Sequence, residues 1–376
     1  MKICILGPAH PLRGGIASFN ERLALQFQNE GHQVDVITFS LQYPNLLFPG
    51  KTQFSDAKAP ENIHIEVLVN SINPLNWIKT AIKINAKNYD FLIVRYWTPF
   101  LAPCLGTISK LVKNKNKTKV ICLVDNIIPH EKHFFDSILT RYFIRGIDGY
   151  VTMSQSVLED LKSFHVKVPI TLTPHPMFDN FGEKVTREEA LQKLELSSDY
   201  RYFLYFGLIR SYKGLDLLLD AFADEKIKKY PVKLIVAGEF YEDSTPYFAQ
   251  IEKHNLSENL VLKTEFIPND LVAHYFCAAD LVILPYKNAT QSGVTQIAYH
   301  FSKPMLVTNV GGLPEIVPDG KCGYAVKPQV DDIRNAILDF LENDKKSFFI
   351  EGLESEKERF QWDKMSNTFY QIFEKL

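Results

Sequence analysis

The sequence lacks most of the features that mark specialised classes of protein. Its five cysteines are scattered, odd in number and mostly set in apolar runs, so we expect reduced core thiols without disulfides or a cysteine metal site. No apolar run approaches the ~20 residues that span a bilayer. The first residues, MKICIL, lead straight into a strand without the layout of a signal peptide. These absences predict a cytoplasmic protein.

Signatures of cofactors and metals are absent as well. The loop PAHPLRGGIAS at 8–18 follows the first predicted strand, but it is not the G-x-G-x-x-G loop of dinucleotide-binding folds, which argues against a nicotinamide cofactor. There is no Asp-x-Asp pair and no histidine cluster, so no metal site is predicted. We expect no cofactor and no nucleic-acid partner.

Charge is divided unevenly along the chain. Residues 1–180 hold 19 Lys and Arg against 14 Asp and Glu, whereas the whole chain has a net charge of −2, so the remainder is acidic. A helix predicted at about 75–88 carries Lys79, Lys83 and Lys87 on one face. One prediction is therefore a peripheral contact of this half with the inner face of the membrane. An ordinary solvated helix face is the simpler alternative.

The chain does contain enough apolar residues for two domains, with 376 residues and 46% hydrophobic content. Each half begins with a buried strand that is followed by a loop and a helix, and the two strands are KICILG at 2–7 and YFLYFG at 202–207. The composition becomes polar and acidic at 179–196. We therefore predict two Rossmann-like α/β domains with a boundary in that segment.

The segment 284–318, LPYKNATQSGVTQIAYHFSKPMLVTNVGGLPEIVP, has the most informative pattern. An apolar strand at 280–285 runs into the turn Thr-Gln-Ser-Gly at 290–293, which opens a helix. Unpaired backbone amides and the positive end of a helix dipole then meet at one place, which suits a phosphate. A purely structural βαβ unit is the alternative that this turn alone leaves open.

The stretch KPMLVTNVGGLPEIVPDGKCGYAV at 303–326 resembles the donor-binding half of GT-B glycosyltransferases of the family 4 type, and the resemblance extends over essentially the whole chain. It implies a GT-B fold in which two Rossmann-like domains face each other across a cleft. The acceptor-binding domain would be 1–180 and the nucleotide-sugar-binding domain 181–358. A C-terminal helix, 359–376, would cross back to the N-terminal domain.

The resemblance also implies roles for residues at the ends of several strands. The loop FGLIRSYKGLDLLLDAF at 206–222 resembles a clamp in which an Arg and a Lys hold the donor diphosphate. Lys213 stands at the position of the family lysine. The position at which the family has its arginine is Leu208 here, so the role of the arginine is assigned to Arg210. The remaining implied donor contacts are Gly14, Gly15, Phe266, Ile267, Gln291, Ser292, Gly293 and Val294, with Arg13 beside the acceptor.

Two further positions depart from the family pattern. Asp125 and Asn126 stand where the family usually has His-Asp near the donor sugar, and His130 could replace the missing imidazole; a loop-bracing role for the first two is the alternative. The family usually has two glutamates eight residues apart, but the matching positions here are Ala289 and Ile297, or Asn288 and Gln296 in a register shifted by one. Gln296 is the candidate amide replacement.

The resemblance implies a metal-independent glycosyltransferase that retains anomeric configuration and uses a nucleoside-diphosphate sugar. The acceptor would be a saccharide or a lipid-linked molecule in surface polysaccharide or glycolipid synthesis. Two alternatives remain open, a catalytically silent GT-B module that binds nucleotide sugars and a GT-B-like sugar-nucleotide epimerase. The missing glutamates support the silent module.

Overall fold

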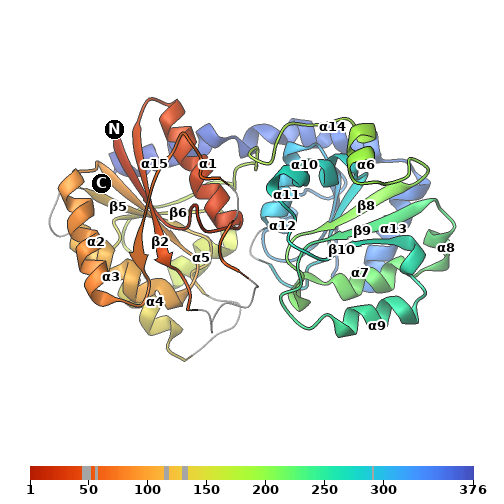
Figure 1. Ribbon diagram of the computed structural model, residues 1–376, viewed down its shortest axis with the longest axis horizontal. Coiled ribbons are helices and arrows are strands. Elements are labelled where there is room, and N and C mark those ends of the chain that lie inside the picture. The colour runs from red at the N-terminus through yellow and green to blue at the C-terminus, as the bar shows by residue number, and fades with distance from the viewer. Residues whose placement is uncertain (45–51, 56–57, 114–117, 129–133, 290–291) are drawn as a thin grey trace. The chain divides into compact units, whose positions relative to one another are not determined.

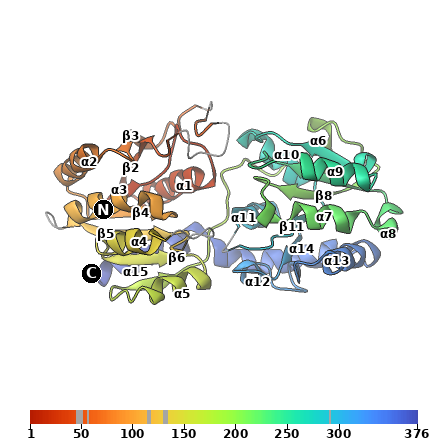
Figure 2. The ribbon, with the colours of Figure 1, turned by 90° about the horizontal axis from the view of Figure 1, so that it is seen from below.

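The chain forms two compact units, each built on a parallel β-sheet (Figures 1 and 2). The computed structural model describes residues 1–44, 52–55, 58–113, 118–128, 134–289 and 292–376. The first unit comprises Met1–Pro176 and Gln361–Leu376, and the second comprises Met177–Phe360. The predicted α/β class with two parallel-sheet domains is confirmed.

The sheet of the first unit has seven strands in the order β3-β2-β1-β4-β5-β6-β7. The strands are β1 (Lys2–Leu6), β2 (Gln33–Leu41), β3 (His64–Asn70), β4 (Phe91–Tyr96), β5 (Lys119–Val124), β6 (Gly149–Thr152) and β7 (Ile170–Leu172). The central strands are apolar along their whole length because helices cover both faces of a parallel sheet. The order reverses between β1 and β4, and such a reversal opens a crevice at the carboxyl ends of the strands.

Two layers of helices enclose this sheet. The helices are α1 (Gly15–Asn29), α2 (Pro74–Lys87), η2 (Pro99–Leu101), α3 (Ala102–Lys113), α4 (Asp136–Ile144), α5 (Gln155–Ser163) and α15 (Trp362–Glu374). Alternate residues of β4 separate the layers: Phe91 packs against Phe27 of α1, while Leu92 joins the apolar core beneath α2, α3 and α4.

The C-terminal helix α15 belongs to the first unit and packs beside α1 (Figure 1). The ring of Phe369 lies 5.9 Å from that of Phe27, between centroids. Ser366 donates a 2.6 Å hydrogen bond to Glu30 at the end of α1, and the Tyr370 hydroxyl donates to the same carboxylate. Apolar packing and hydrogen bonds thus both hold α15 in this layer.

The second unit has a six-stranded parallel sheet in the order β10-β9-β8-β11-β12-β13. Its strands are β8 (Arg201–Phe206), β9 (Val232–Ala237), β10 (Leu260–Lys263), β11 (Leu281–Leu284), β12 (Met305–Thr308) and β13 (Gly323–Val326). The order reverses between β8 and β11. The loops that follow these two strands therefore begin side by side at the carboxyl edge.

Helices cover both faces of the second sheet as well. They are α6 (Arg187–Lys193), η3 (Ser211–Lys213), α7 (Leu215–Phe222), α8 (Glu225–Lys228), α9 (Thr245–Lys253), η4 (Ser257–Asn259), α10 (Asn269–Ala278), α11 (Gly293–His300), α12 (Leu313–Ile316), α13 (Val330–Glu342), α14 (Lys346–Glu356) and η5 (Lys357–Phe360). The main core of this unit joins α7, α9 and α13 to one face of the sheet.

Sequence patterning did not predict two of these helices. In α14 only Phe349 and Leu353 are buried, so the apolar stripe is too short to stand out. In α4 only Thr140 and Phe143 are buried, and several large apolar side chains face outward. Both helices depend on their neighbours more than on a strong amphipathic pattern.

A buried ion pair lies at the carboxyl edge of the first sheet. Arg95 of β4 donates from Nε to Asp125 Oδ2 at 2.6 Å and from Nη2 to Oδ1 at 2.5 Å. The guanidinium also stacks on Phe19 of α1, 4.1 Å from the ring centroid. Burial raises the pKa of the Asp125 carboxyl, and the adjacent Arg95 opposes that rise. The pair is therefore mutually dependent, since either charge alone would be buried without compensation.

We expect Arg95→Met to lower the free energy of unfolding of the first unit by about 3–5 kcal/mol, because it leaves a buried carboxylate unpaired. The double substitution Arg95→Met/Asp125→Leu should cost much less, since it removes both charges. Tryptophan fluorescence during urea unfolding measures this unit selectively, because Trp77, Trp97 and Trp362 all belong to it. Equal destabilisation of the single and double variants would contradict the interpretation.

Candidate functional site

The loop after β8 is held close to the segment after β11 in the second unit. Gly214 follows η3 with φ 69°, and a Cβ atom there would lie 2.0 Å from the carbonyl oxygen of Pro285. Only glycine permits both this backbone conformation and this approach. The Lys287 amide donates to the Tyr212 carbonyl at 2.7 Å. The turn that carries the predicted clamp residues is therefore fixed against the neighbouring strand end.

Lys213 has no anionic partner among the residues that the structure describes. No side chain in the described part of the chain forms an ion pair with it, and its Nζ atom lies 5.4 Å from the ring centroid of Tyr286. Burial lowers the pKa of the Lys213 ammonium, and the nearby positive charge of Arg210 lowers it further. An anion at this position would stabilise the charged form of Lys213 and oppose both effects.

Arg210 lies on the same turn as Lys213. Its guanidinium is 5.5 Å from the ring centroid of Tyr241, and it too forms no ion pair with any described residue. The backbone around it is ordered by the neighbouring loop, because the Ile209 amide donates to the Glu239 carbonyl at 2.9 Å. Two cations thus stand close together on one short turn without a carboxylate between them.

The N-terminus of α11 is next to this turn. Gly207 directly follows β8, and a Cβ atom there would lie 3.4 Å from Lys213 Nζ and 3.6 Å from a methyl of Val294, in the first turn of α11. Ser292 precedes α11, but its side chain does not cap the helix. The helix start therefore keeps amide donors available toward the same side as Lys213.

The side chain of Tyr286 lies near both Lys213 and the residue that precedes α11. Its hydroxyl lies 3.2 Å from Ser292 Oγ, and its ring is the one that Lys213 approaches. Burial raises the pKa of the Tyr286 hydroxyl to about 12, so it remains a neutral hydrogen-bonding group at physiological pH. Sequence analysis did not single out Tyr286; its position directly after the Leu281–Leu284 strand was the available signal.

Together, Arg210, Lys213 and the start of α11 form a site with the chemistry to bind an anion. Two cations and helix amide groups can each interact with phosphate oxygens, and a diphosphate offers several such oxygens. Fixed positive groups also stabilise negative charge that develops during a reaction, without the need for reorganisation. The structure brings these predicted residues together in the second unit.

The structure gives less support to the other predicted donor contacts than to Arg210 and Lys213. Phe266 is 39% exposed in the loop after β10, whereas Ile267 is buried. Gln296 is completely buried in α11, and neither atom of its amide group is hydrogen bonded within the described residues. Gln291 lies outside the described residues. Gln296 is thus an interior side chain with unmet hydrogen-bonding capacity.

In the first unit, the predicted residues follow two strands of the sheet: Arg13, Gly14 and Gly15 come between β1 and α1, and Asp125 and Asn126 come directly after β5. Gly14 has φ 112° and Gly15 begins α1, and a Cβ on either residue would meet no atom within 4 Å. Arg13 is already engaged, because its Nε donates to the Thr52 carbonyl at 2.9 Å. The two glycines therefore leave space at the helix start, while Arg13 braces the adjoining loop.

Asp125 is committed to Arg95 through both carboxylate oxygens. This contact fits the bracing alternative for Asp125 better than a role in proton transfer. Asn126 follows it and is half-buried, and His130 lies outside the described residues. Sequence analysis missed Arg95, although a lone arginine in the apolar strand FLIVRY at 91–96 requires a buried partner.

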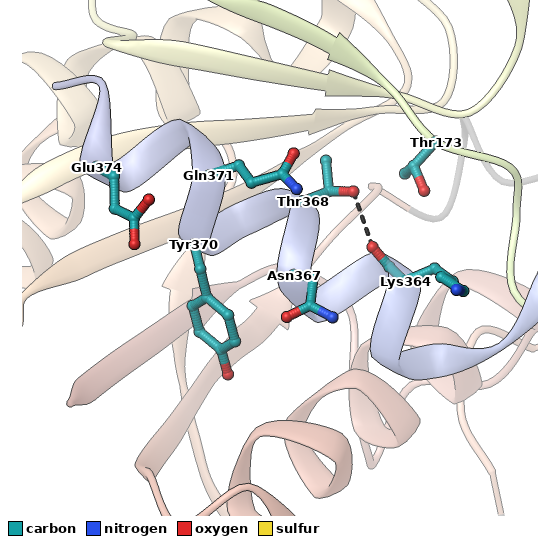
Figure 3. A pocket seen from close by; sticks show the side chains of 7 residues that line it. All are labelled: Thr173, Lys364, Asn367, Thr368, Tyr370, Gln371 and Glu374. Carbon is teal, nitrogen blue, oxygen red and sulfur yellow. Dashed lines mark hydrogen bonds between the residues drawn. The ribbon is translucent and has the colours of Figure 1, made fainter.

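Two pockets have linings that include none of the predicted site residues. A 570 Å³ concavity runs along α15 in the first unit (Figure 3), and its lining residues are Thr173, Lys364, Asn367, Thr368, Tyr370, Gln371 and Glu374. A 320 Å³ pocket beside Ser211 in the second unit is lined mainly by acidic and polar groups, including Asp216, Glu242 and Asp243. Neither lining suits a diphosphate as well as the Arg210–Lys213 turn does.

Within the described ranges, no group of three or more His, Cys, Asp and Glu side chains is arranged to hold a metal ion. None of the helices formed by those residues combines the length and the apolar character needed to cross a bilayer.

The chain is similar to known proteins in both sequence and structure. Among curated relatives, an uncharacterised glycosyltransferase of Methanocaldococcus jannaschii is 30% identical over 181 residues, which cover 47% of this chain and 49% of the relative. A lipopolysaccharide 1,2-N-acetylglucosaminetransferase of Salmonella typhimurium is 26% identical over 195 residues, covering 48% and 51%. The chain thus spans about half the length of these two relatives.

The structural similarity extends over the whole chain. The structure of Anabaena Alr3699/HepE in complex with UDP matches with a TM-score of 0.76 at 15% identity and covers 100% of both chains. This likeness confirms the GT-B fold. The sequence model described as Glycosyltransferase Family 4 matches residues 13–177, and the one described as Glycosyl transferases group 1 matches residues 186–349. The chain therefore belongs to the glycosyltransferases of the GT-B fold, family 4 (group 1) type.

Proposed function

We propose that this protein transfers a sugar from a nucleoside-diphosphate sugar to a saccharide or lipid-linked acceptor. The proposal is carried by two cations beside the start of α11, Arg210 and Lys213, which have no anionic partner among the described residues. The donor diphosphate would occupy this position. The similarity to a HepE structure in complex with UDP supports a nucleotide donor, and that to a lipopolysaccharide glycosyltransferase supports a surface-glycan acceptor.

In the proposed reaction, the bond between the anomeric carbon and the diphosphate breaks, the oxygen of the acceptor hydroxyl forms the new glycosidic bond, and the hydroxyl proton passes to the departing diphosphate. The departing nucleoside diphosphate gains negative charge as the bond breaks. Arg210, Lys213 and the amides of Gly293 and Val294 would stabilise this charge, so the proposal requires no metal ion and no cofactor. By analogy with the family, the proposed transfer retains anomeric configuration.

The proposal assigns the acceptor side to the first unit. Gly14 and Gly15 would allow the ligand to approach the start of α1, and Asn126 would contribute a polar group at the same sheet edge. Asp125 would act by positioning Asn126 through its bonds to Arg95. The proposal also places the enzyme in the cytoplasm, where it would meet its acceptor at the inner face of the membrane.

The first test is a metal-free screen of UDP-, GDP-, ADP- and dTDP-sugars that records nucleotide release with pooled saccharide and lipid acceptors. We expect release from one donor, and we expect Arg210→Ala/Lys213→Ala to weaken binding of that nucleotide by at least about 100-fold, because two charged hydrogen-bonding groups are lost. Lys229→Ala/Lys253→Ala is the matched control, since both lysines are exposed on the same unit. Unchanged nucleotide binding in the Arg210/Lys213 variant would overturn the assigned site.

A catalytically silent nucleotide-sugar-binding module is the second candidate, favoured by the absence of both family glutamates. Tight binding of one nucleotide with no turnover under any acceptor would establish it. A GT-B-like epimerase would instead interconvert two nucleotide sugars without any acceptor. Analysis of the recovered sugar nucleotides distinguishes the epimerase from both other functions.

Tyr286 provides a finer test of the same site. Tyr286→Phe removes the hydroxyl that contacts Ser292 but keeps the ring beside Lys213. We expect KM for the donor to rise about fivefold, the effect of one hydrogen bond, with a smaller change in kcat. Tyr324→Phe is the control. Tyr324 lies on β13, and the substitution removes its hydrogen bond to Asp339 of α13. Equal effects of the two substitutions would show that Tyr286 has no special role.

A further inference from the structure

The 320 Å³ pocket of the second unit adjoins the turn that carries Arg210 and Lys213. Ser211, which lies between these two residues in the chain, is one of its lining residues. Other walls come from α7 and α9, which pack side by side (Figure 1), and from Lys287 after β11. All these walls follow the carboxyl ends of strands, and this is the sheet edge at which ligands bind in such folds. The pocket is therefore a candidate for a second ligand beside the donor diphosphate.

The lining of this pocket is acidic. Asp216, Glu242 and Asp243 contribute three carboxylates, and Lys287 is the one cation among the described residues that line it. The Lys287 ammonium is already paired with Asp216, from Nζ to Oδ2 at 2.6 Å. Repulsion by the two remaining carboxylates disfavours a phosphate or any other anion. In the part of the chain that the structure describes, no three His, Cys, Asp or Glu side chains are arranged to hold a metal ion.

Two buried polar atoms in this region have unmet hydrogen-bonding capacity. Asp216 Oδ1 is buried and, unlike Oδ2, has no hydrogen-bond partner among the described residues. The hydroxyl of Tyr205, a completely buried residue of β8, has none among them either. Burial raises the pKa of this hydroxyl, and nearby groups, including Tyr247 and Glu242 of the lining, raise it further. Because buried polar atoms are normally paired, these two atoms favour a ligand group that both donates and accepts hydrogen bonds.

Aromatic side chains accompany the polar groups of the pocket. Tyr247 lines it, and the next residue of α9, Phe248, is 45% exposed. The ring of Phe248 lies 5.9 Å from that of Phe240, between centroids. Tyr212, which follows Ser211 on the clamp turn, is 37% exposed. Such rings offer flat apolar area against which the C–H face of a sugar can pack.

We propose that this pocket binds a sugar ring at a site separate from that of the donor diphosphate. Each sugar hydroxyl both donates and accepts hydrogen bonds, so it can interact with Asp216, Glu242 and the amide of Gln250 alike. The volume of 320 Å³ is at the lower end of the range for small-molecule sites, which suits one or two sugar rings. Only the source of the sugar rests on the proposed function: it is either a free sugar or a unit of the glycan that the enzyme extends.

An organic cation such as a polyamine is the main competing ligand, since the lining has more carboxylates than cations. An ammonium group donates hydrogen bonds but accepts none. It could pair with Asp216, but it could not accept a hydrogen bond from the Tyr205 hydroxyl. The combination of an unpaired acceptor with an unpaired hydroxyl therefore favours the sugar.

The experiment is ligand-observed NMR of the full chain with the methyl glycosides of glucose, galactose, mannose and N-acetylglucosamine, and with maltose, lactose, mannobiose and chitobiose. We expect saturation transfer to at least one of these sugars. Stronger binding of a disaccharide than of the matching methyl glycoside identifies a glycan as the source, whereas equal binding identifies a free sugar. Spermidine is the probe for an organic cation.

Two variants test the pocket, Glu242→Ala/Gln250→Ala and Asp216→Asn. The first removes two polar groups of the lining, and the second replaces the carboxylate that has the unpaired oxygen with an amide. Each should weaken sugar binding by about tenfold, the effect of losing a hydrogen bond to a charged group. The matched control is Glu252→Ala/Gln192→Ala, which removes the same types of side chain from exposed positions of the second unit. Circular dichroism and thermal unfolding check that each variant is folded.

Absence of sugar binding, normal sugar binding by both pocket variants, or binding of spermidine in place of a sugar would each overturn the proposal. Nucleotide binding separates this inference from the proposed function. Glu242→Ala/Gln250→Ala should bind nucleotide as the unaltered protein does, and Arg210→Ala/Lys213→Ala should retain sugar binding. Loss of sugar binding in the latter variant would assign the sugar to the donor site and overturn a separate pocket. Sugar binding without nucleotide binding in the unaltered protein would defeat the proposed function alone.

Discussion

The central constraint on the second unit is the placement of positive charge at the carboxyl edge of its sheet. Arg210 and Lys213 stand on one short turn, and the positive end of α11 lies beside them. Repulsion between these two neighbouring cations raises the free energy of the unliganded protein. Burial of the Lys213 ammonium raises this free energy further. A bound anion would relieve both effects. This is why the arrangement is better explained by ligand binding than by stability.

The backbone around these cations shows how the fold supports them. β8 and β11 are neighbours at the point where the strand order reverses, so their loops leave the sheet together. The contact of Gly214 with Pro285 draws the clamp turn against the β11 segment, and Tyr286 then reaches Ser292 at the start of α11. The cations and the helix start are thus held on rigid elements, as precise ligand binding requires.

The first unit uses charge in a different way. At its sheet edge, Arg95 and Asp125 compensate each other in the interior and brace the position from which Asn126 extends. On helices α2 and α4, by contrast, Lys79 and Arg141 have no carboxylate partner among the described residues, and the same helices expose apolar side chains such as Ile82 and Ile138. An ion pair inside the fold braces the structure, as Arg95 and Asp125 do. Surface charges without an ion-pair partner instead attract ligands of opposite charge.

The sequence by itself determined the fold class, because apolar strands, glycine turns and helix caps are local signals, as at KICILG and at the Ser154 cap of α5. It also singled out Ser292, from the strand and the helix start around it, whereas Arg210 and Lys213 were indicated by the resemblance of their loop to the clamp of the family. Their surroundings follow from the tertiary structure alone: Lys213 has no anionic partner among the described residues, Tyr286 contacts Ser292, and Asp125 is bound by Arg95. Partners that are 30 residues apart, like Arg95 and Asp125, meet through strand pairing. The exposed apolar side chains of α2 and α4 likewise share a layer only because both helices pack on α3.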